Sequence, residues 1–240
     1  MSRESEKKTP RHVAVIMDGN GRWAAMRKLP RLRGHEEGAE SVISIVRACR
    51  DAGVEYLTLY AFSRENWSRP RAEVYGLMDI LLRFLRQKEH ELHDNRVRLR
   101  VIGRIGDLSK AVQKELQRVQ DATRDYKGGT VVFALSYGGR SEIVDAARQI
   151  ALRVKAGEIE PGEIDEDMIS RNLYAPDIPD PDLLIRTSGE MRVSNFLLWQ
   201  ISYAELYVSD VLWPDFREEE FLKALAEYSR RDRRFGGRKG

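Results

Sequence analysis

The sequence is poor in cysteine: Cys49 is the single one among 240 residues. One thiol excludes an intramolecular disulfide framework, and the lack of disulfides predicts a reducing, cytoplasmic compartment. Long apolar runs are also absent, because none approaches the ~20 residues that a membrane-spanning helix needs. The first nine residues are polar and charged, without the apolar core of a secretory signal. We therefore expect a soluble protein that can still touch a membrane surface from its cytoplasmic side.

A strong excess of either charge is missing as well. Lys and Arg number 41 against 38 Asp and Glu, which leaves a formal net charge of +3. This balance argues against a general nucleic-acid binder, so no nucleic-acid partner is expected. The basic side chains instead gather in two clusters that suit a small polyanion. These clusters are Arg22, Arg27, Lys28, Arg31 and Arg33 near the front, and Arg230 to Lys239 at the end.

Short apolar runs and amphipathic stretches alternate along the chain. The runs predict six strands, at His12–Asp18, Val54–Phe62, Val97–Gly103, Thr130–Ser136, Asp182–Thr187 and Leu206–Leu212. Helical spacing of apolar residues predicts helices at Glu36–Ala52, after Pro70 with a stripe from Val74 to Leu85, and at Leu108–Tyr126, Ser141–Ala156 and Ser194–Glu205. The alternation predicts an α/β fold, a single domain with a central, mostly parallel six-stranded sheet flanked by helices.

The most informative stretch is residues 12–24, HVAVIMDGNGRWA. Its apolar, β-branched run ends at the carboxylate of Asp18. Gly19 and Gly21 then allow a sharp turn that exposes backbone N–H groups, and Arg22 adds a guanidinium. A carboxylate followed by free amides and a guanidinium suits a phosphate-rich anion that carries a divalent metal.

Two other interpretations of this stretch stay open. The spacing Gly19-x-Gly21-x-x-Ala24 also fits the dinucleotide-binding fingerprint after a strand, although no acid ends the next strand in the ribose position. A plain β-turn with a solvated Asp18 is the other interpretation.

In parallel sheets, ligands bind beyond the carboxyl ends of the strands. That rule collects residues 18–23, 63–69, 137–140 and 186–195 at one edge. In the second of these segments, polar side chains precede Pro70, and Asn66 can both donate and accept hydrogen bonds. A capped loop without a ligand is the alternative for this segment.

The segment after the fifth predicted strand is a second candidate anion site. Arg186 ends the strand, Gly189 bends the chain, and Arg192 and Ser194 lead into a predicted helix. The N-terminus of such a helix attracts phosphate. Salt bridging at the surface to Glu190 is the alternative.

Four further polar positions lie outside these segments: Glu205, His35, His90 and His93. Glu205 ends the apolar helical stretch, where a carboxylate is costly unless a metal or an arginine pairs with it. His35 suits either a diphosphate contact or a helix cap. His90 and His93 lie one residue short of the zinc-protease spacing, with no third ligand, so no zinc site is expected there.

Taken together, these segments make the sequence resemble the cis-prenyltransferase family, most closely its bacterial undecaprenyl diphosphate synthases (isoprenyl transferases). The matching segments are His12–Ala24, Leu57–Pro70, Tyr137–Arg140, Asp182–Phe196 and Tyr203–Phe216. The resemblance implies condensation of isopentenyl diphosphate onto an allylic diphosphate, usually farnesyl diphosphate, with new cis double bonds. The implied product is a long-chain polyprenyl diphosphate such as undecaprenyl diphosphate, the lipid carrier of cell-wall precursors. The implied cofactor is Mg²⁺ and the implied assembly is a homodimer.

The resemblance also implies roles for individual residues. Asp18 handles the magnesium-bound diphosphate, Asn66 accepts or relays a proton, and Glu205 is the second magnesium-associated carboxylate. Substrate-binding positions are implied at Gly19, Asn20, Gly21, Arg22, Trp23, Arg31, His35, Ser63, Arg64, Glu65, Trp67, Arg69, Arg186, Arg192, Val193 and Ser194. Arg64 and Ser188 depart from the commonest bacterial wording, which has Ser and Gly at these positions.

The growing hydrocarbon chain of such an enzyme needs a dry tunnel. Its natural walls are the stripe from Val74 to Leu85 and the run from Val131 to Leu135, although both patterns also suit plain core. The catalytic domain is expected at residues 12–229, between a polar tail at 1–11 and a basic tail at 230–240. A non-catalytic partner subunit is the second functional hypothesis, and a dinucleotide-binding oxidoreductase is the third.

Overall fold

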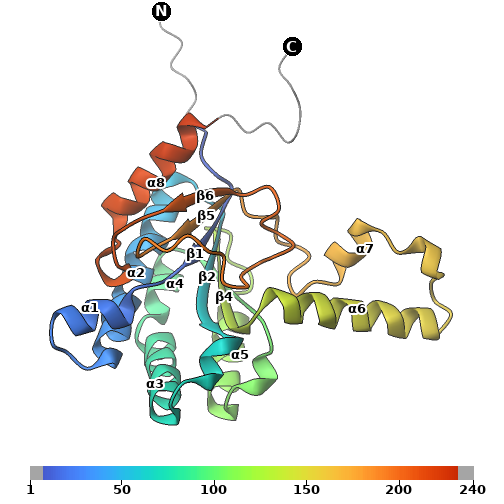
Figure 1. Cartoon of the computed structure of the whole chain (residues 1–240), viewed down its shortest axis with the longest axis horizontal. Helices are drawn as coiled ribbons and strands as arrows, with labels where there is room; N and C mark the ends of the chain where they lie inside the picture. The colour runs from blue at the N-terminus through green and yellow to red at the C-terminus, as the bar shows by residue number, and fades with distance from the viewer. Residues whose placement is uncertain (1–7, 232–240) are drawn as a thin grey trace, which may run out of the picture.

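One sheet of six parallel strands runs through the centre of the molecule, in the order β3-β4-β2-β1-β5-β6 (Figure 1). The computed structural model describes residues 8–231, so most of the two expected tails lies outside the described residues. The strands are β1 (His12–Ile16), β2 (Tyr56–Ser63), β3 (Arg98–Ile102), β4 (Thr130–Tyr137), β5 (Leu183–Arg186) and β6 (Glu205–Val208). Each neighbouring pair is parallel, which confirms the predicted α/β sheet and makes it parallel throughout.

Helices and short 3-10 turns connect these strands. The helices are α1 (Asn20–Met26), α2 (Arg31–Ala52), α3 (Arg71–Gln87), α4 (Glu89–Asp94), α5 (Lys110–Thr123), α6 (Gly139–Lys155), α7 (Glu166–Arg171) and α8 (Glu218–Arg230). The 3-10 turns are η1 (Arg64–Ser68), η2 (Ile105–Asp107), η3 (Pro161–Glu163) and η4 (Trp213–Asp215). Within residues 8–231, no helix has both the length and the apolar character to cross a membrane.

The two faces of the sheet are covered in different ways. Helices α2, α3, α4, α5 and α8 pack their apolar stripes on one face and form the larger core with it. The other face is covered mainly by irregular chain, from 174–178 and 193–204, which forms a smaller core. Helices α6 and α7 project away from the sheet as an arm (Figure 1). The irregular cover matters for function because it places loops, rather than a helix, over the ends of β4 and β5.

The predicted helix at Ser194–Glu205 is wrong. Ser194, Asn195 and Leu197 have φ values of +47°, +62° and +45°, which no right-handed helix accommodates. The apolar residues whose spacing predicted a helix pack instead in the smaller core as irregular chain. Phe196 is fully buried and stacks on Tyr60 with ring centroids 4.4 Å apart. Burial of such an aromatic side chain outweighs local helix propensity.

His12 opens β1 and is almost completely buried. Its two ring nitrogens pair with the Pro179 carbonyl at 2.6 Å and the Thr58 hydroxyl at 2.8 Å. Burial lowers the pKa of His12 to about 4, although the hydrogen bond to Pro179 opposes the shift. The imidazole is therefore neutral in the folded chain at neutral pH.

We expect this buried histidine to make the fold sensitive to acid. The pKa is about 4 when folded and 6.5 when unfolded, so the unfolded chain binds more protons between these values and stability falls as pH drops. The contribution of His12 to the loss is about 2 kcal/mol at pH 5. Urea unfolding at pH 8 and pH 5 measures it, with His12→Gln as the control. Equal losses in both proteins would contradict the assignment.

Candidate active site

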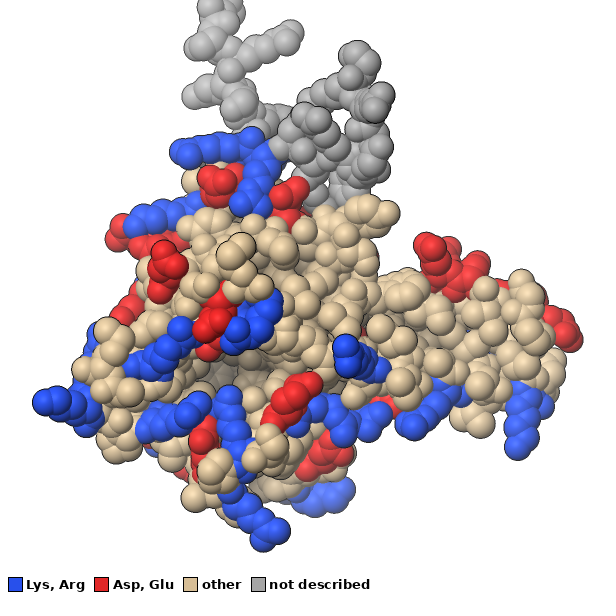
Figure 2. Space-filling view, in the orientation of Figure 1, with Lys and Arg blue, Asp and Glu red and all other residues tan. Residues whose placement is uncertain are grey.

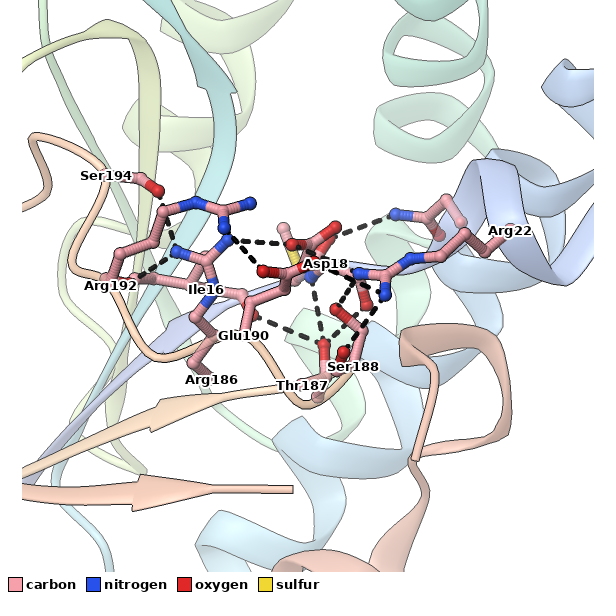
Figure 3. A network of polar contacts seen from close by, with 11 residues as sticks. Ile16, Asp18, Arg22, Arg186, Thr187, Ser188, Glu190, Arg192 and Ser194 are labelled. Carbon is pink, nitrogen blue, oxygen red and sulfur yellow. Dashed lines mark hydrogen bonds and ion pairs between the residues drawn. The ribbon is translucent and has the colours of Figure 1, made fainter. Parts of the chain in front are cut away.

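The polar segments after β1, β2, β4 and β5 meet at the carboxyl edge of the sheet, as predicted. Parallel pairing brings this about, since β1 lies between β2 and β5 in register. Figure 2 shows this side of the molecule, where basic and acidic side chains surround a central hollow. The charged network at the hollow is drawn in Figure 3.

The carboxylate of Asp18 is the centre of that network. Its Oδ2 accepts a hydrogen bond from Arg186 at 2.8 Å and lies 3.6 Å from the Arg22 guanidinium. Burial by itself would raise the pKa of Asp18, but the Arg186 hydrogen bond and the two positive charges lower it below its usual value. Asp18 is therefore a carboxylate at neutral pH and can serve as a metal ligand.

Thr187 fixes the backbone of Asp18, a role that the sequence did not indicate. The hydroxyl of this fully buried residue accepts the Asp18 N–H at 2.9 Å and lies 2.6 Å from the Asp18 carbonyl. A threonine after a strand-end arginine carries no distinctive pattern. Only the parallel pairing of β1 with β5 reveals its partner.

Replacement of Thr187 by valine removes both hydrogen bonds between this hydroxyl and the Asp18 backbone, while the Asp18 N–H keeps the Ile16 carbonyl at 3.0 Å. Each intramolecular hydrogen bond contributes about 0.5–1.5 kcal/mol, so we expect Thr187→Val to lower the free energy of unfolding by about 1–3 kcal/mol. Thr187→Ser keeps the hydroxyl and should cost clearly less. Chemical denaturation of the two variants distinguishes the outcomes, and equal destabilisation would argue that packing, rather than the hydroxyl, holds this loop.

Arg22 and Arg192 share an acidic partner in the loop that follows β5. Arg22 donates to the Ser188 carbonyl at 3.1 Å and to its hydroxyl, and lies 3.5 Å from Glu190. Arg192 is exposed and ion-pairs with the same Glu190, so the salt bridge expected as an alternative is present. Ser188 adopts φ +76°, a conformation that glycine takes without cost. Serine at this position therefore keeps the glycine-like turn and adds a hydroxyl for Arg22.

Arg186 and Ser194 form the second candidate anion site. Arg186 is buried and donates to the Ser194 hydroxyl at 2.7 Å and to the Arg192 carbonyl, and its Nε has no hydrogen-bond partner within residues 8–231. The predicted helix N-terminus is absent here, so anion binding would rest on side chains alone. Val193 is half-buried and packs on the smaller core, which orients the segment.

Asn20 and the glycines beside it form the polar end of a pocket. Gly19 precedes α1 with φ +110°, a conformation that L side chains rarely adopt. A Cβ on Gly34 of α2 would lie 2.0 Å from the Asn20 carbonyl oxygen, so glycine permits close approach of α1 to α2. The Oδ1 of Asn20 is buried and meets no hydrogen-bond partner in the described part of the chain, and Gly21 lines the same pocket.

His35, Arg31 and Arg69 line the pocket beside this loop. Glu73 holds both arginines, with distances of 3.2 Å to Arg31 and 2.9 Å to Arg69. Burial and the charges of Arg69 and Arg31 lower the pKa of His35 to about 4. The Nε2 of His35 is buried and has no hydrogen-bond partner among the described residues. A neutral imidazole with a free ring nitrogen, between two guanidinium groups, suits an anionic ligand.

Asn66 faces the pocket from η1. Its Oδ1 accepts the Ser63 N–H at 3.1 Å, which caps η1, whereas the cap expected at Ser68 or Arg69 before α3 is absent among the described residues; Asn66 also lines the pocket with Arg69. Only the oxygen of an amide can accept this bond, so the Nδ2 group is the one left to meet a ligand. In this geometry Asn66 is a hydrogen-bond donor toward the pocket.

The whole pocket has a volume of about 200 Å³, and it continues from this polar end into an apolar interior. Its inner walls come from α3 and β4, the two segments predicted as tunnel walls. The apolar lining includes Leu77, Met78, Ile80, Leu81, Phe84, Phe133 and Leu135. One cavity thus joins phosphate-binding chemistry to a hydrocarbon-lined space.

Some predicted substrate positions are engaged elsewhere in the structure. Trp23 donates to Asp215 at 2.7 Å, and Trp67 donates to the Ser136 hydroxyl at 2.9 Å. Glu65 accepts a hydrogen bond from Asn195 at 2.9 Å. Arg64, at the start of η1, has a buried Nη1 that makes no hydrogen bond to any described residue. These positions shape the loops around the pocket and do not line it.

Glu205 is not brought to Asp18 within the chain. It begins β6 opposite Leu183, whereas Arg186 lies opposite Val208. Three residues of strand separate these registers, which is about 10 Å. Glu205 ion-pairs with Arg231 at 3.1 Å, the arginine pairing that the sequence left open. A role for Glu205 at the same metal as Asp18 stays a prediction.

Magnesium at this site would take oxygen ligands from Asp18 and from a bound substrate. Residues 8–231 contain no group of three or more His, Cys, Asp or Glu side chains able to enclose a metal. Mg²⁺ is commonly held by one or two carboxylates together with substrate phosphates and waters. Asp18, ionised and half-buried at the pocket mouth, fits this kind of site.

Sequence and structure comparisons agree with this geometry. A family model described as putative undecaprenyl diphosphate synthase matches residues 16–236. The chain belongs to this prenyltransferase family. The match confirms the resemblance seen in the sequence, and the dinucleotide-binding oxidoreductase hypothesis is dropped.

Relatives of this prenyltransferase cover nearly its whole length. It is 50% identical over 228 residues to a ditrans,polycis-undecaprenyl-diphosphate synthase of Micrococcus luteus that is farnesyl-diphosphate specific, covering 95% of this chain and 92% of that one. It is 49% identical to an isoprenyl transferase of Heliobacterium mobile, covering 95% and 88%. Among solved structures, a lavandulyl diphosphate synthase from Lavandula x intermedia, in complex with dimethylallyl diphosphate, superposes with a TM-score of 0.93 at 38% identity, covering 95% and 98%. A probable undecaprenyl diphosphate synthase from Campylobacter jejuni gives 0.79 at 34%, covering 95% and 99%.

Proposed function

We propose that the enzyme elongates an allylic diphosphate, with farnesyl diphosphate as first primer, by repeated cis addition of isopentenyl diphosphate to give undecaprenyl diphosphate. The observation that carries this proposal is the continuous pocket from Asp18 and Arg31 to the apolar walls of α3 and β4. A ligand with a diphosphate head and a hydrocarbon tail matches both ends. The 50% identity to a farnesyl-specific undecaprenyl diphosphate synthase supports the substrate and the product.

The two substrates would occupy opposite sides of Asp18. The allylic diphosphate binds the loop of Gly19 to Gly21 with Arg31 and His35, and its tail enters the apolar pocket. Isopentenyl diphosphate binds Arg186, Arg192 and Ser194. The side chains that now neutralise these arginines, Asp18 and Glu190, would give way to phosphate oxygens of higher charge. Binding at these two sites would hold the two reacting carbons close together and in the correct orientation, which raises the reaction rate.

Magnesium would be held by Asp18 and diphosphate oxygens, where it neutralises negative charge on the leaving diphosphate. The arginines would also neutralise this charge, since fixed positive groups stabilise the negative charge that develops as the allylic C–O bond breaks. We infer that Asn66 does not accept the proton, because its oxygen is held by the Ser63 N–H. Its amide N–H group would orient the diphosphate of the second substrate, whose oxygen takes the proton.

We expect the pocket walls to set the length of the product. Leu81 lines the pocket on α3, and Leu81→Trp would fill part of the apolar space. Product should stop at shorter chains, because added bulk in a packed wall blocks further extension. Tyr75→Trp is the control, since Tyr75 lies on the same helix and is 71% exposed. The measurement is incorporation of labelled isopentenyl diphosphate with farnesyl diphosphate and Mg²⁺, resolved by chain length. An unchanged ladder in Leu81→Trp would contradict this assignment of the pocket.

The same assay tests the proposed function itself. A ladder ending near eleven isoprene units, by analogy with the family, is the expected wild-type result. A single short product would instead place the enzyme with short-chain relatives such as the lavandulyl diphosphate synthase. No incorporation with any allylic primer would favour the non-catalytic partner subunit.

We also propose a homodimer and a cytoplasmic location with peripheral membrane contact. The edge strand β6 supports the dimer, because Leu206 and Val208 are 52% and 37% exposed along it. The hydrocarbon product supports membrane contact, since a long polyprenyl chain leaves water for a bilayer. Residues 12–229 would be the catalytic domain.

A further inference from the structure

Asn195 lies where three segments of the active-site edge meet. Its Nδ2 donates to Glu65 of η1 at 2.9 Å, and its Oδ1 accepts the Arg140 N–H at 2.9 Å. Its backbone carbonyl accepts the Gly139 N–H at 2.7 Å. One residue therefore joins the loop after β5 to η1 and to the first turn of α6.

Asn195 connects the two segments that carry Ser194 and Asn66. Asn195 directly follows Ser194 of the second anion site, and Glu65 directly precedes Asn66. A single hydrogen bond thus links the segment assigned to isopentenyl diphosphate with the segment that carries Asn66. The Tyr60 hydroxyl, 3.3 Å from the Ser194 carbonyl, supports the same segment from β2.

The local geometry requires the shape and polarity of asparagine. The backbone of Asn195 is left-handed, with φ +62°, and Asn and Asp tolerate this region better than most side chains. A Cβ on Gly138 would lie 2.7 Å from the Asn195 Nδ2, so the amide fills the space against the backbone of that glycine. The amide of Asn195 offers a donor to Glu65 and an acceptor to Arg140 from two separate atoms of one short side chain.

We propose that Asn195 is a positioning residue that holds the isopentenyl diphosphate segment at a fixed distance from η1. This inference rests on the proposed function. The new bond forms only when the alkene of one substrate lies close to the allylic carbon of the other. A shift of about 1 Å between the two segments is enough to cost about 100-fold in rate. Asn195 contacts neither reacting atom and acts through Ser194 and Asn66.

Asn195→Asp separates the proposed link from the helix cap. The new carboxylate still accepts the Arg140 N–H, and negative charge is favourable at a helix N-terminus, so α6 keeps its first turn. The donor to Glu65 is lost, and two carboxylates face each other instead. We expect kcat/KM for isopentenyl diphosphate to fall about 100-fold, while the affinity for the allylic diphosphate, measured by equilibrium binding, stays within about twofold.

A second substitution should restore the link. Glu65→Gln offers an amide that donates to the new carboxylate, so the double variant regains a hydrogen bond between the two segments. We expect it to recover most of the activity lost by Asn195→Asp, whereas a purely structural defect would not be repaired. Glu65→Ala removes the same bond from the other side and tests the proposal should Asn195→Asp fail to fold.

The outcomes separate this inference from the proposed function. Wild-type activity for Asn195→Asp, or a double variant no better than Asn195→Asp, would overturn the positioning role while the wild-type ladder stands. Absence of incorporation by the wild-type enzyme would instead overturn the proposed function.

Discussion

Asp18→Asn should abolish turnover with little change in fold. Asparagine has nearly the same shape, but it carries no charge to hold a magnesium–diphosphate complex at the pocket mouth. Loss of one preorganised electrostatic group at a reacting centre costs on the order of 10²–10³ in rate, and we expect the upper end because Asp18 is the carboxylate proposed to hold the magnesium. Incorporation of labelled isopentenyl diphosphate at saturating substrates measures the effect.

Asp215→Asn is the matched control for this substitution. Asp215 is also a carboxylate that pairs with an arginine, at 3.3 Å from Arg27, but its side chain is 48% exposed and lies outside the pocket. Its replacement should leave the rate within about twofold of wild type. A substantial rate in Asp18→Asn, at unchanged magnesium requirement, would remove Asp18 from the metal site.

Arg186→Met should raise the KM for isopentenyl diphosphate about 100-fold, since loss of a buried, hydrogen-bonded charge partner typically costs several kcal/mol. The guanidinium is buried and contacts Asp18, Ser194 and the Arg192 carbonyl at once. Methionine retains much of the volume and none of the donors. The effect on KM for the allylic primer should be much smaller, because the primer loop lies on the other side of Asp18.

Arg27→Met provides the comparison for that result. Arg27 pairs with Asp215 at the surface and lies over the Trp23 ring, 4.1 Å from its centroid. Exposed ion pairs contribute little, so kinetic constants should stay within about twofold. Equal increases in KM for both substrates in Arg186→Met would mean that Arg186 organises the whole edge rather than one diphosphate.

The apolar patterns of the sequence predicted the strands correctly, and they also predicted the helices that pack on the sheet through a single apolar stripe. All six strands lie within two residues of their expected starts, because continuous β-branched runs have few alternatives in a covered sheet. The helix expected at Ser194–Glu205 was wrong because helical spacing there reflects burial against the smaller core. Ser194, Asn195 and Leu197 adopt left-handed backbone conformations there, and no glycine marks this turn in the sequence.

Part of the candidate site was also predictable from sequence. The strand–Asp18–glycine pattern and the carboxyl-edge rule together placed the loop of Gly19 to Gly21, Asn66 and Arg186 at one edge. Thr187 and Asn195 were missed, since each acts through partners more than 50 residues away in the chain. Glu205 was assigned by resemblance, and its pairing with Arg231 became visible only in three dimensions.

The sequence by itself determined the fold class and the family, because apolar strand runs and a dense local motif can be recognised without knowing any tertiary contact. It also determined which charged groups exist at the edge of the sheet. Tertiary structure alone decided which of them meet, which atom of the Asn66 amide the Ser63 N–H holds, and which loops Asn195 ties together. The physical reason is that hydrogen bonds and burial join residues by distance in space, and parallel strand order brings distant segments within 3 Å of one another.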